Sequence, residues 1–182
     1  MRGPLLATLL LALPLGPAAA QPQKAQLDRW FADLAKAETA DDAKPIEEKI
    51  DAAFRQSGSP SVDLLMSRAK EAVAGGDSRT AASIVAAVNR LAPNYAEGWR
   101  LRAMLDAAAG EDSAAMLALQ KVISLNPRHF GAMVELAGML EDYGDKSGAL
   151  KLYRQVLTVS PRNEAAVNRV RALSREVEGQ GI

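Results

Sequence analysis

The sequence predicts an all-α solenoid, a stack of helix–turn–helix units, and two observations support this fold class. Apolar residues recur at three- and four-residue spacing among abundant Ala, Leu, Glu, Arg and Lys, which are good helix formers. Identical residues also recur every 34 positions, which indicates stacked units that work through an extended surface. These columns are Ala69, Ala103 and Ala137; Gly76, Gly110 and Gly144; Ala81, Ala115 and Ala149; Val88, Val122 and Val156; and Pro93, Pro127 and Pro161.

Each 34-residue unit divides into two predicted helices. The first helix ends at the glycine, because Gly takes a left-handed C′ conformation without a Cβ penalty. The acid that follows, Asp77, Glu111 or Asp145, can cap the second helix. The second helix ends before the proline, which forces the preceding residue out of the α conformation. The alanine columns fall where the two helices cross closely.

Three helical hairpins follow from this division, and helical patterns flank them. The hairpins span 61–93, 95–127 and 129–161, within repeats at 61–94, 95–128 and 129–162. Residues 163–182 form a predicted capping helix and tail with a polar outer face, which keeps a stack soluble. Its inward residues are Ala166, Val167, Val170 and Leu173.

Residues 21–60 predict an N-terminal helical hairpin and linker, which we interpret as a degenerate repeat stacked before the first full one. Ser59 is the expected N-cap of the next helix and Pro60 its first residue. A flexible arm over 24–56 is the alternative, but its aromatic residues argue against that. The whole pattern amounts to nine helices.

Residues 1–20 have the pattern of a cleaved secretory signal peptide. Arg2 precedes an apolar stretch from Leu5 to Leu15, and Ala18-Ala19-Ala20 gives an A-x-A cleavage site. A transmembrane anchor is the alternative, but the apolar run is far shorter than the ~20 residues that a span needs. We expect no membrane span after cleavage. An exported, Ala-rich chain without Cys favours a Gram-negative periplasm.

Charge and residue chemistry argue against several classes of function. The 22 basic and 22 acidic side chains balance, so no net field draws the protein toward nucleic acid or an anionic membrane. One His and no Cys cannot supply a zinc or iron site, and no phosphate-binding glycine motif is present. The sequence contains the residue types of a Ser–His–Asp triad that would use His129, but it has no nucleophile-elbow pattern. We therefore expect no enzymatic activity, cofactor or metal.

The repeat columns resemble those of the tetratricopeptide repeat (TPR) family. The family's first large position holds Trp99, with Leu65 and Met133 as counterparts, and its second-helix aromatic is Tyr153. The Ala and Pro columns match as well. The chain departs from the pattern at Arg68 and Arg102, where Leu is usual, and at Ala72 and Asp106, where an aromatic is usual. The resemblance implies a right-handed TPR-type α-solenoid. The wider arrangement is similar to exported TPR proteins of alphaproteobacteria, a group without an established enzymatic reaction.

The same resemblance implies where a partner would bind. In the TPR fold the first helix of each hairpin lines a concave groove. The family's groove positions correspond here to Asp63, Met66, Lys70, Glu97, Arg100, Met104, Val134 and Glu141. Methionines suit varied apolar peptides, and Lys70 and Arg100 would make the charge contacts. Two glycines, Gly131 and Gly138, would open the groove.

Some TPR domains bind the C-termini of chaperones through a two-carboxylate clamp, and this chain lacks that clamp. Its five places hold Met66, Lys70, Leu101, Gly131 and Glu135.

We therefore expect a non-enzymatic periplasmic adaptor or scaffold that holds a peptide segment of a cell-envelope partner. Several alternatives stay open, and so does the oligomeric state. The groove could be only part of the surface of a helical scaffold, with no ligand. Alternatively, the protein could self-associate through Trp30, Phe31 and Trp99. A cell-wall enzyme accessory would instead need a deep acidic pocket. His129 is either a surface or capping side chain beside a packed Phe130, or a partner contact at the groove rim.

Overall fold

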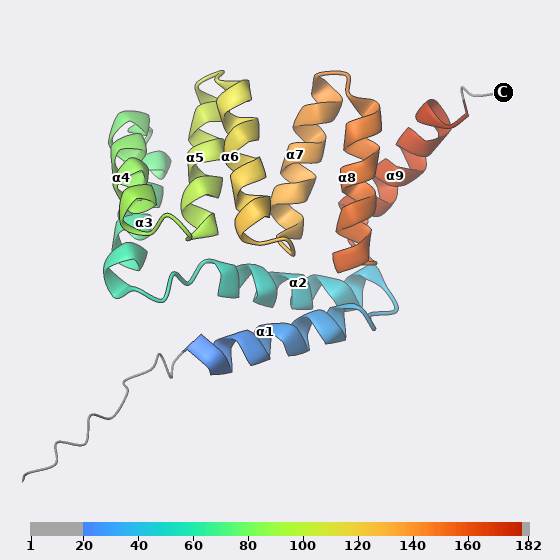
Figure 1. Cartoon of the computed structure of the whole chain (residues 1–182), viewed down its shortest axis with the longest axis horizontal. Helices are drawn as coiled ribbons and strands as arrows, with labels where there is room; N and C mark the ends of the chain where they lie inside the picture. The colour runs from blue at the N-terminus through green and yellow to red at the C-terminus, as the bar shows by residue number, and fades with distance from the viewer. Residues whose placement is uncertain (1–19, 180–182) are drawn as a thin grey trace, which may run out of the picture.

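The computed structural model describes residues 20–179, which form nine α-helices and no strand (Figure 1). The helices are α1 (Ala20–Leu34), α2 (Ala40–Phe54), α3 (Pro60–Ala74), α4 (Ser78–Leu91), α5 (Ala96–Ala108), α6 (Asp112–Leu125), α7 (Phe130–Asp142), α8 (Lys146–Val159) and α9 (Glu164–Val177). The predicted all-α solenoid is confirmed. None of the described helices is both long and apolar enough to cross a membrane. The expected signal peptide, apart from Ala20, lies outside the described residues.

Helices α3 to α8 form three antiparallel hairpins, which stand side by side in Figure 1. The glycine after each first helix has a positive φ, a conformation that strains any residue with a Cβ. These φ values are 78° at Gly76 and Gly110 and 82° at Gly144. The residue before each proline has left the α conformation, as predicted. The φ values there are −132° at Ala92, −137° at Asn126 and −130° at Ser160.

The predicted caps form in two of the three repeats. Asp77 accepts a hydrogen bond from the Thr80 N–H at 3.0 Å, and Asp145 accepts one from the Gly148 N–H at 2.8 Å. Glu111 holds the same position but makes no side-chain cap. Ser59 also stands at an N-cap position without a side-chain bond, ahead of Pro60 at the first turn. The local signals therefore set the helix ends even where one cap is missing.

The alanine columns lie between the packed helices. All six alanines are no more than 3% exposed. Larger side chains would overpack these crossings, at a cost of about 1–3 kcal/mol each.

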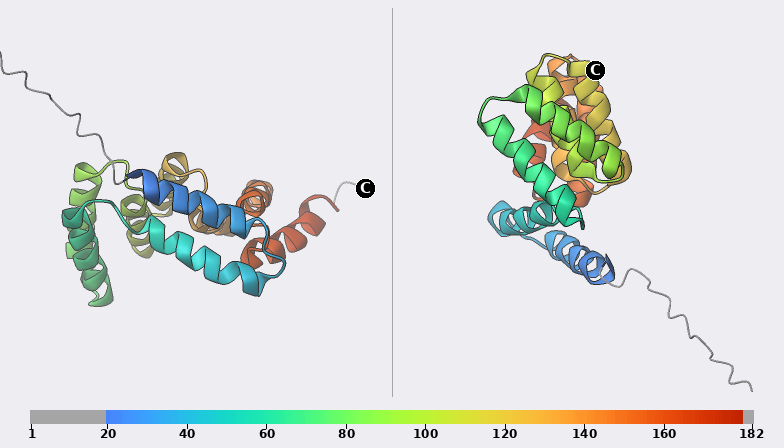
Figure 2. Two further views of the ribbon diagram at one scale, coloured as in Figure 1. Left: turned by 90° about the horizontal axis from the view of Figure 1, so that it is seen from below. Right: turned by 90° about the vertical axis from the view of Figure 1, so that its left-hand side faces the viewer.

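The N-terminal hairpin departs from the prediction, because it does not continue the stack. Helices α1 and α2 lie across the ends of the repeat helices, beneath them in Figure 1, and Figure 2 shows the same crossing from below. Leu34 and Ile50 are fully buried in one apolar cluster with Met133 of α7 and Leu173 of α9. The expected stacking before the first repeat is therefore wrong. The hairpin buries its apolar side chains against the third repeat and the C-terminal helix instead.

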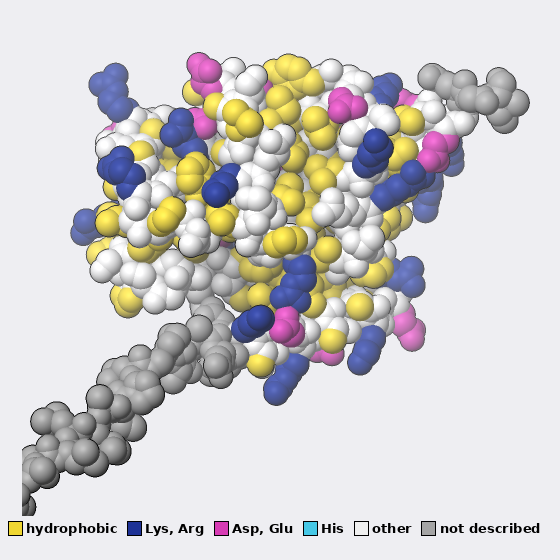
Figure 3. All heavy atoms as spheres, viewed as in Figure 1, with side chains coloured by type: hydrophobic (Ala, Val, Ile, Leu, Met, Phe, Trp, Pro, Cys, Tyr) yellow, Lys and Arg dark blue, Asp and Glu magenta, His cyan; other side chains and the backbone are white. Residues whose placement is uncertain are grey.

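Helix α9 packs on α8 and covers the end of the stack. Ala166 and Leu173 are fully buried, and Val167 and Val170 are partly buried. Figure 3 shows hydrophobic side chains between α6 and α7 on the face seen in Figure 1, with charged side chains of both signs mostly toward its margins. The interspersed signs fit the equal numbers of acids and bases.

Candidate peptide-binding groove

The first helices of the three repeats line one hollow of about 700 Å³, which we call the main groove. Arg55, which follows α2, closes it on one side, and Tyr153 of α8 also reaches it. Much of the lining is apolar: Met66, Leu101, Met104, Val134 and Met139 are among its residues. Its charged residues are Arg55, Lys70, Glu97, Arg100, Glu135 and Asp142. The groove therefore has an apolar floor and three charges of each sign.

Six of the eight predicted groove residues line the main groove: Met66, Lys70, Glu97, Arg100, Met104 and Val134. They differ in what they offer to a ligand. Met66 is only 3% exposed and belongs to the core, whereas Met104 is 47% exposed. Met104 therefore presents much more of its side chain to a ligand than Met66 does.

The other two predicted residues, Asp63 and Glu141, do not line the main groove. The Asp63 carboxylate accepts a hydrogen bond from the Ser57 N–H at 2.9 Å and fastens the linker ahead of α3. Glu141 pairs with Arg169, whose Nε donates to it at 3.0 Å, and this joins α7 to α9. Both carboxylates are engaged in holding the fold together.

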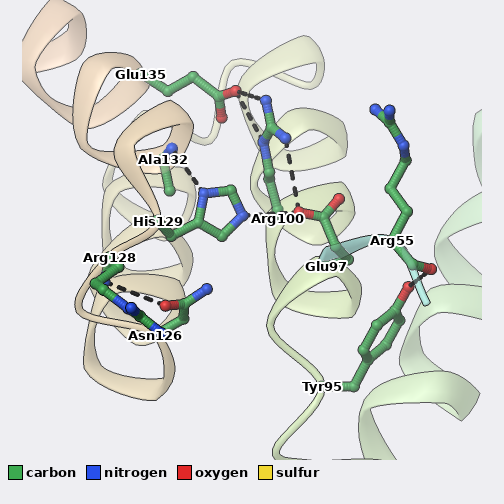
Figure 4. Close-up of polar contacts among 9 residues, drawn as sticks. All are labelled: Arg55, Tyr95, Glu97, Arg100, Asn126, Arg128, His129, Ala132 and Glu135. Carbon is green, nitrogen blue, oxygen red and sulfur yellow. Dashed lines mark hydrogen bonds and ion pairs between the residues drawn. The ribbon is translucent and has the colours of Figure 1, made fainter. Parts of the chain in front are cut away.

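A buried polar network lies beside the main groove (Figure 4). Glu97 is 7% exposed and His129 is fully buried, with 2.7 Å between His129 Nε2 and Glu97 Oε1. His129 Nδ1 accepts the Ala132 N–H at 3.3 Å and so caps α7. Because Nδ1 accepts, the neutral ring carries its proton on Nε2 and donates it to Glu97. His129 is therefore a buried capping side chain, at neither the surface nor the groove rim.

Arg100, which lines the main groove, also belongs to the same network. Its Nε and Nη2 donate to Glu135 at 2.9 and 2.5 Å, and its Nη1 lies 3.6 Å from Glu97. A buried carboxylate such as Glu97 needs compensating charge and hydrogen bonds. Arg100 supplies part of that compensation, so its charge is already neutralised by two acids. Lys70, by contrast, is exposed and in no ion pair among the described residues.

The network shifts the pKa values of its acids in opposite directions. Burial acts to raise the pKa of Glu97, but the His129 hydrogen bond and the positive charges of Arg100 and Lys70 outweigh it, so the pKa of Glu97 is lowered. Burial raises the pKa of Asp51, on α2, above its ordinary value, although the neighbouring Arg100 and His129 act to lower it. Glu97 is thus held as a carboxylate, whereas Asp51 lacks full compensation.

Three residues spaced 34 apart join the repeats to the N-terminal hairpin, and we call them the N-cap column. They are Tyr95, His129 and Asn163, at the N-caps of α5, α7 and α9. The Tyr95 hydroxyl donates to the Arg55 carbonyl at 2.6 Å, and the His129 ring centroid lies 4.8 Å from that of Phe54. Asn163 Nδ2 donates to the Glu47 carboxylate at 2.8 Å. The sequence prediction missed this column, although its spacing is visible in the sequence.

The aromatic residues expected for self-association make contacts within the chain. Phe31 is 8% exposed, and Arg128 lies 4.2 Å above its ring while pairing with Asp28. Trp30 packs against the same apolar cluster, and Trp99 Nε1 donates to the Pro93 carbonyl at 2.9 Å. These side chains are used in packing the hairpin and the repeat turns.

A smaller hollow of about 380 Å³, the side pocket, lies where α2 approaches α5, α7 and the start of α9. It shares Arg100, Val134 and Glu135 with the main groove. Over residues 20–179, no group of three His, Asp or Glu side chains is arranged to hold a metal ion.

The fold and the groove define a class, the α-helical repeat proteins with a concave groove, and comparison with known proteins identifies the family. No family model matches the sequence. A TPR repeat-containing protein of Rhizobium etli is 30% identical over 156 residues, which cover 86% of this chain and 76% of that protein. The chain belongs to the TPR repeat family.

Solved TPR structures share the fold at low sequence identity. The Sgt2 TPR domain of Aspergillus fumigatus has a TM-score of 0.58 and 20% identity, covering 67% of this chain and 82% of that one. MamA has a TM-score of 0.58 and 22% identity, with 76% and 84% covered. The first TPR of RPAP3, solved with the HSP90 peptide SRMEEVD, has a TM-score of 0.58 and 18% identity, with 64% and 93% covered. These likenesses show the fold.

Proposed function

We propose that this protein is a non-enzymatic adaptor or scaffold that holds a peptide segment of a cell-envelope partner in the main groove. The observation that supports this most is the continuity of the groove across α3, α5 and α7. A segment lying there would contact three repeats at once. Apolar side chains would be buried against Met104 and Val134, and polar ones would meet charged rims, as in other peptide-binding grooves.

The proposed partner differs from the chaperone peptides that some structural relatives bind. RPAP3 is seen with an HSP90 peptide, and a TPR domain of yeast Sti1 with an Hsp70 one. Here the places of the two-carboxylate clamp hold residues such as Leu101, Gly131 and Glu135. Lys70 is the one base among the five places, and an acid and three uncharged residues at the other four do not favour a carboxylate-rich terminus.

The periplasmic part of the proposal rests on the sequence of residues 1–20 and on the absence of Cys. Expression in a Gram-negative host followed by fractionation tests it. We expect periplasmic protein that begins at Gln21. Uncleaved protein confined to the cytoplasm would overturn this part.

Site-specific photocrosslinking tests the groove itself. A benzoylphenylalanine at Met104, 47% exposed in the main groove, should give a distinct covalent adduct in native cells. The matched control carries the same group at Leu117 on α6, which is 66% exposed and lines neither hollow. Adducts of the same identity and yield at both positions, or none at Met104, would contradict the proposal.

A further inference from the structure

The side pocket differs from the main groove in its charge, and we infer that it receives a Lys or Arg side chain of the segment held in the main groove. This inference rests on the proposed function, because the basic side chain belongs to the same bound segment. The occupant of the groove would then be an apolar segment that carries one basic residue.

The position of the side pocket allows one segment to reach both hollows. Arg100, Val134 and Glu135 form a wall that faces the main groove and the side pocket alike. On the other side of the pocket, α2 contributes residues such as Glu48 and Asp51. A backbone lying on the shared wall can therefore project one side chain toward α2.

The wall of the side pocket includes a glycine of α7. Gly131 of α7 stands 34 residues after Glu97, so the two occupy the same place in successive repeats. Glu97 reaches His129 with its side chain, whereas Gly131 has none, and a Cβ there would lie 3.4 Å from Arg100 Nη2. The Arg100 guanidinium therefore lies against α7 at the place where a side chain of residue 131 would begin.

The charge of the side pocket fits a cation. Its lining holds four acids, Glu47, Glu48, Asp51 and Glu135, against two bases, Lys44 and Arg100. Arg100 is already neutralised by Glu135 and Glu97, and Glu47 accepts hydrogen bonds from Ser160 and Asn163. Among the described residues, neither Glu48 nor Asp51 is in an ion pair. An acidic ligand side chain would meet this excess of negative charge, whereas a basic one would neutralise it.

Asp51 is the acid of the side pocket with which a cation of the bound segment would pair. Its Oδ1 is buried without a hydrogen-bond donor, which is uncommon and costly for a carboxylate. Burial raises the pKa of Asp51 even though Arg100, His129 and Arg55 act to lower it and only Glu97 adds to the rise. A cation from the bound segment would stabilise the charge of this carboxylate. Phe130 and Val134 supply apolar walls along which the aliphatic stem of Lys or Arg can lie.

Selection from a random displayed 12-residue peptide library tests the inference with the purified full chain. On the native protein we expect apolar peptides enriched in Lys or Arg at one position. The double variant Glu48→Gln, Asp51→Asn should still select apolar peptides, but without the basic preference. Asp33→Asn on α1, an exposed acid that lines neither hollow, is the matched control and should keep the preference.

One selected peptide and its Lys→Met or Arg→Met form then complete a double-mutant cycle. The exchange should weaken binding to the native protein about tenfold and leave binding to the double variant nearly unchanged. Apolar peptides without a basic preference, or a basic preference that survives in the double variant, would overturn the inference while leaving the proposed function in place. A library from which nothing is enriched would contradict the proposed function itself.

Discussion

His129 shows at the residue scale how one side chain joins two repeats and the N-terminal hairpin. It caps α7 through Nδ1, donates to Glu97 of α5 through Nε2, and packs its ring on Phe54 of α2. Each contact uses a different part of the imidazole. No other side chain has a donor, an acceptor and a flat apolar face in one compact ring.

Removing this ring should destabilise the protein substantially. We expect His129→Ala to lower the free energy of unfolding by about 2–4 kcal/mol, because it removes a helix cap and leaves the buried Glu97 carboxylate without its donor. His129→Asn keeps a cap acceptor and should recover about 1 kcal/mol of the loss. Urea unfolding followed by circular dichroism measures both. An unchanged midpoint for His129→Ala would show that the network adds nothing to stability.

Asp51 should make stability depend on pH in the direction opposite to that of a paired carboxylate. Its pKa in the folded protein is raised above the ordinary value of 3.8, so the unfolded chain ionises first as pH rises. Above the raised pKa, the ionised Asp51 lowers the free energy of unfolding. Below the ordinary value the group is protonated in both states, so this destabilisation disappears. We expect Asp51→Asn to be more stable than the native protein at pH 7, with a difference that shrinks toward pH 4.

Asp77 is the control of opposite sign for this measurement. Hydrogen bonds from Thr80 lower the pKa of Asp77, so its contribution to stability is present above the ordinary value and is lost as pH falls through the lowered one. The stability of Asp77→Asn relative to the native protein should therefore rise as pH falls. Urea unfolding between pH 3 and pH 7 compares the two variants. The same trend in both would contradict the assignment for Asp51.

Among the elements, α2 is held by hydrogen bonds at its middle and just beyond its C-terminal end. At the middle of the helix, Glu47 accepts from the Ser160 hydroxyl at 2.6 Å and from Asn163. Just beyond its end, the Arg55 carbonyl accepts from Tyr95. Helix α2 thus runs along the turns between repeats and forms one wall of the side pocket, and Arg55 just beyond it lines the main groove.

Loss of one anchor should loosen this wall and leave the repeats intact. Glu47→Ala leaves the Ser160 hydroxyl and the Asn163 amide without their acceptor, so we expect amide hydrogen exchange in α2 to become about tenfold faster. Exchange in α4 should not change. Lys49→Ala, an exposed position on the same helix, is the control. Equal acceleration in α2 and α4 would show that Glu47 supports the whole fold rather than the wall.

The sequence was sufficient for the repeat helices but not for the placement of α1 and α2. Glycine and proline act locally, so Gly144 and Pro161 mark helix ends whatever surrounds them. The hairpin depends instead on contacts such as Glu47 with Ser160, which are 113 residues apart and follow no repeat.

The candidate site was likewise only partly predictable from the sequence. Position in the repeat was enough to place Met104 and Lys70 on the main groove. It could not show that Arg100 is neutralised, because the other repeats have Leu101 and Ser67 in the place of its partner Glu135. A pairing that occurs in only one repeat produces no residues that recur at 34-residue spacing, so the repeat pattern does not reveal it.

For the whole molecule, the N-terminal hairpin changes how a solenoid should unfold. In a simple repeat array each unit contacts only its neighbours, and the ends can unfold separately. Here the N-terminal hairpin contacts the second repeat through Tyr95 and the C-terminal helix through Asn163. We therefore expect the hairpin, the repeats and the C-terminal helix to unfold as one cooperative unit.

The two tryptophans can test this cooperativity, since Trp30 is in the hairpin and Trp99 in α5. In Trp30→Phe the remaining fluorescence reports the repeats, and in Trp99→Phe it reports the hairpin. We expect the fluorescence and circular dichroism midpoints in urea to coincide within each variant. A hairpin signal that changes at clearly lower urea than the helical signal would show that the hairpin is an independent unit.

Binding of the partner segment to the surface formed by α3, α5 and α7 can be tested by methyl NMR with labelled methionine. Met66, Met104 and Met139 line the main groove, whereas Met133 lies in the core and Met116 of α6 packs against an apolar cluster and does not line the groove. Titration with a selected peptide should shift the methyl resonances of the three groove methionines saturably and leave the other two in place. Saturable shifts at Met116 or Met133, with the groove resonances unchanged, would contradict the claim.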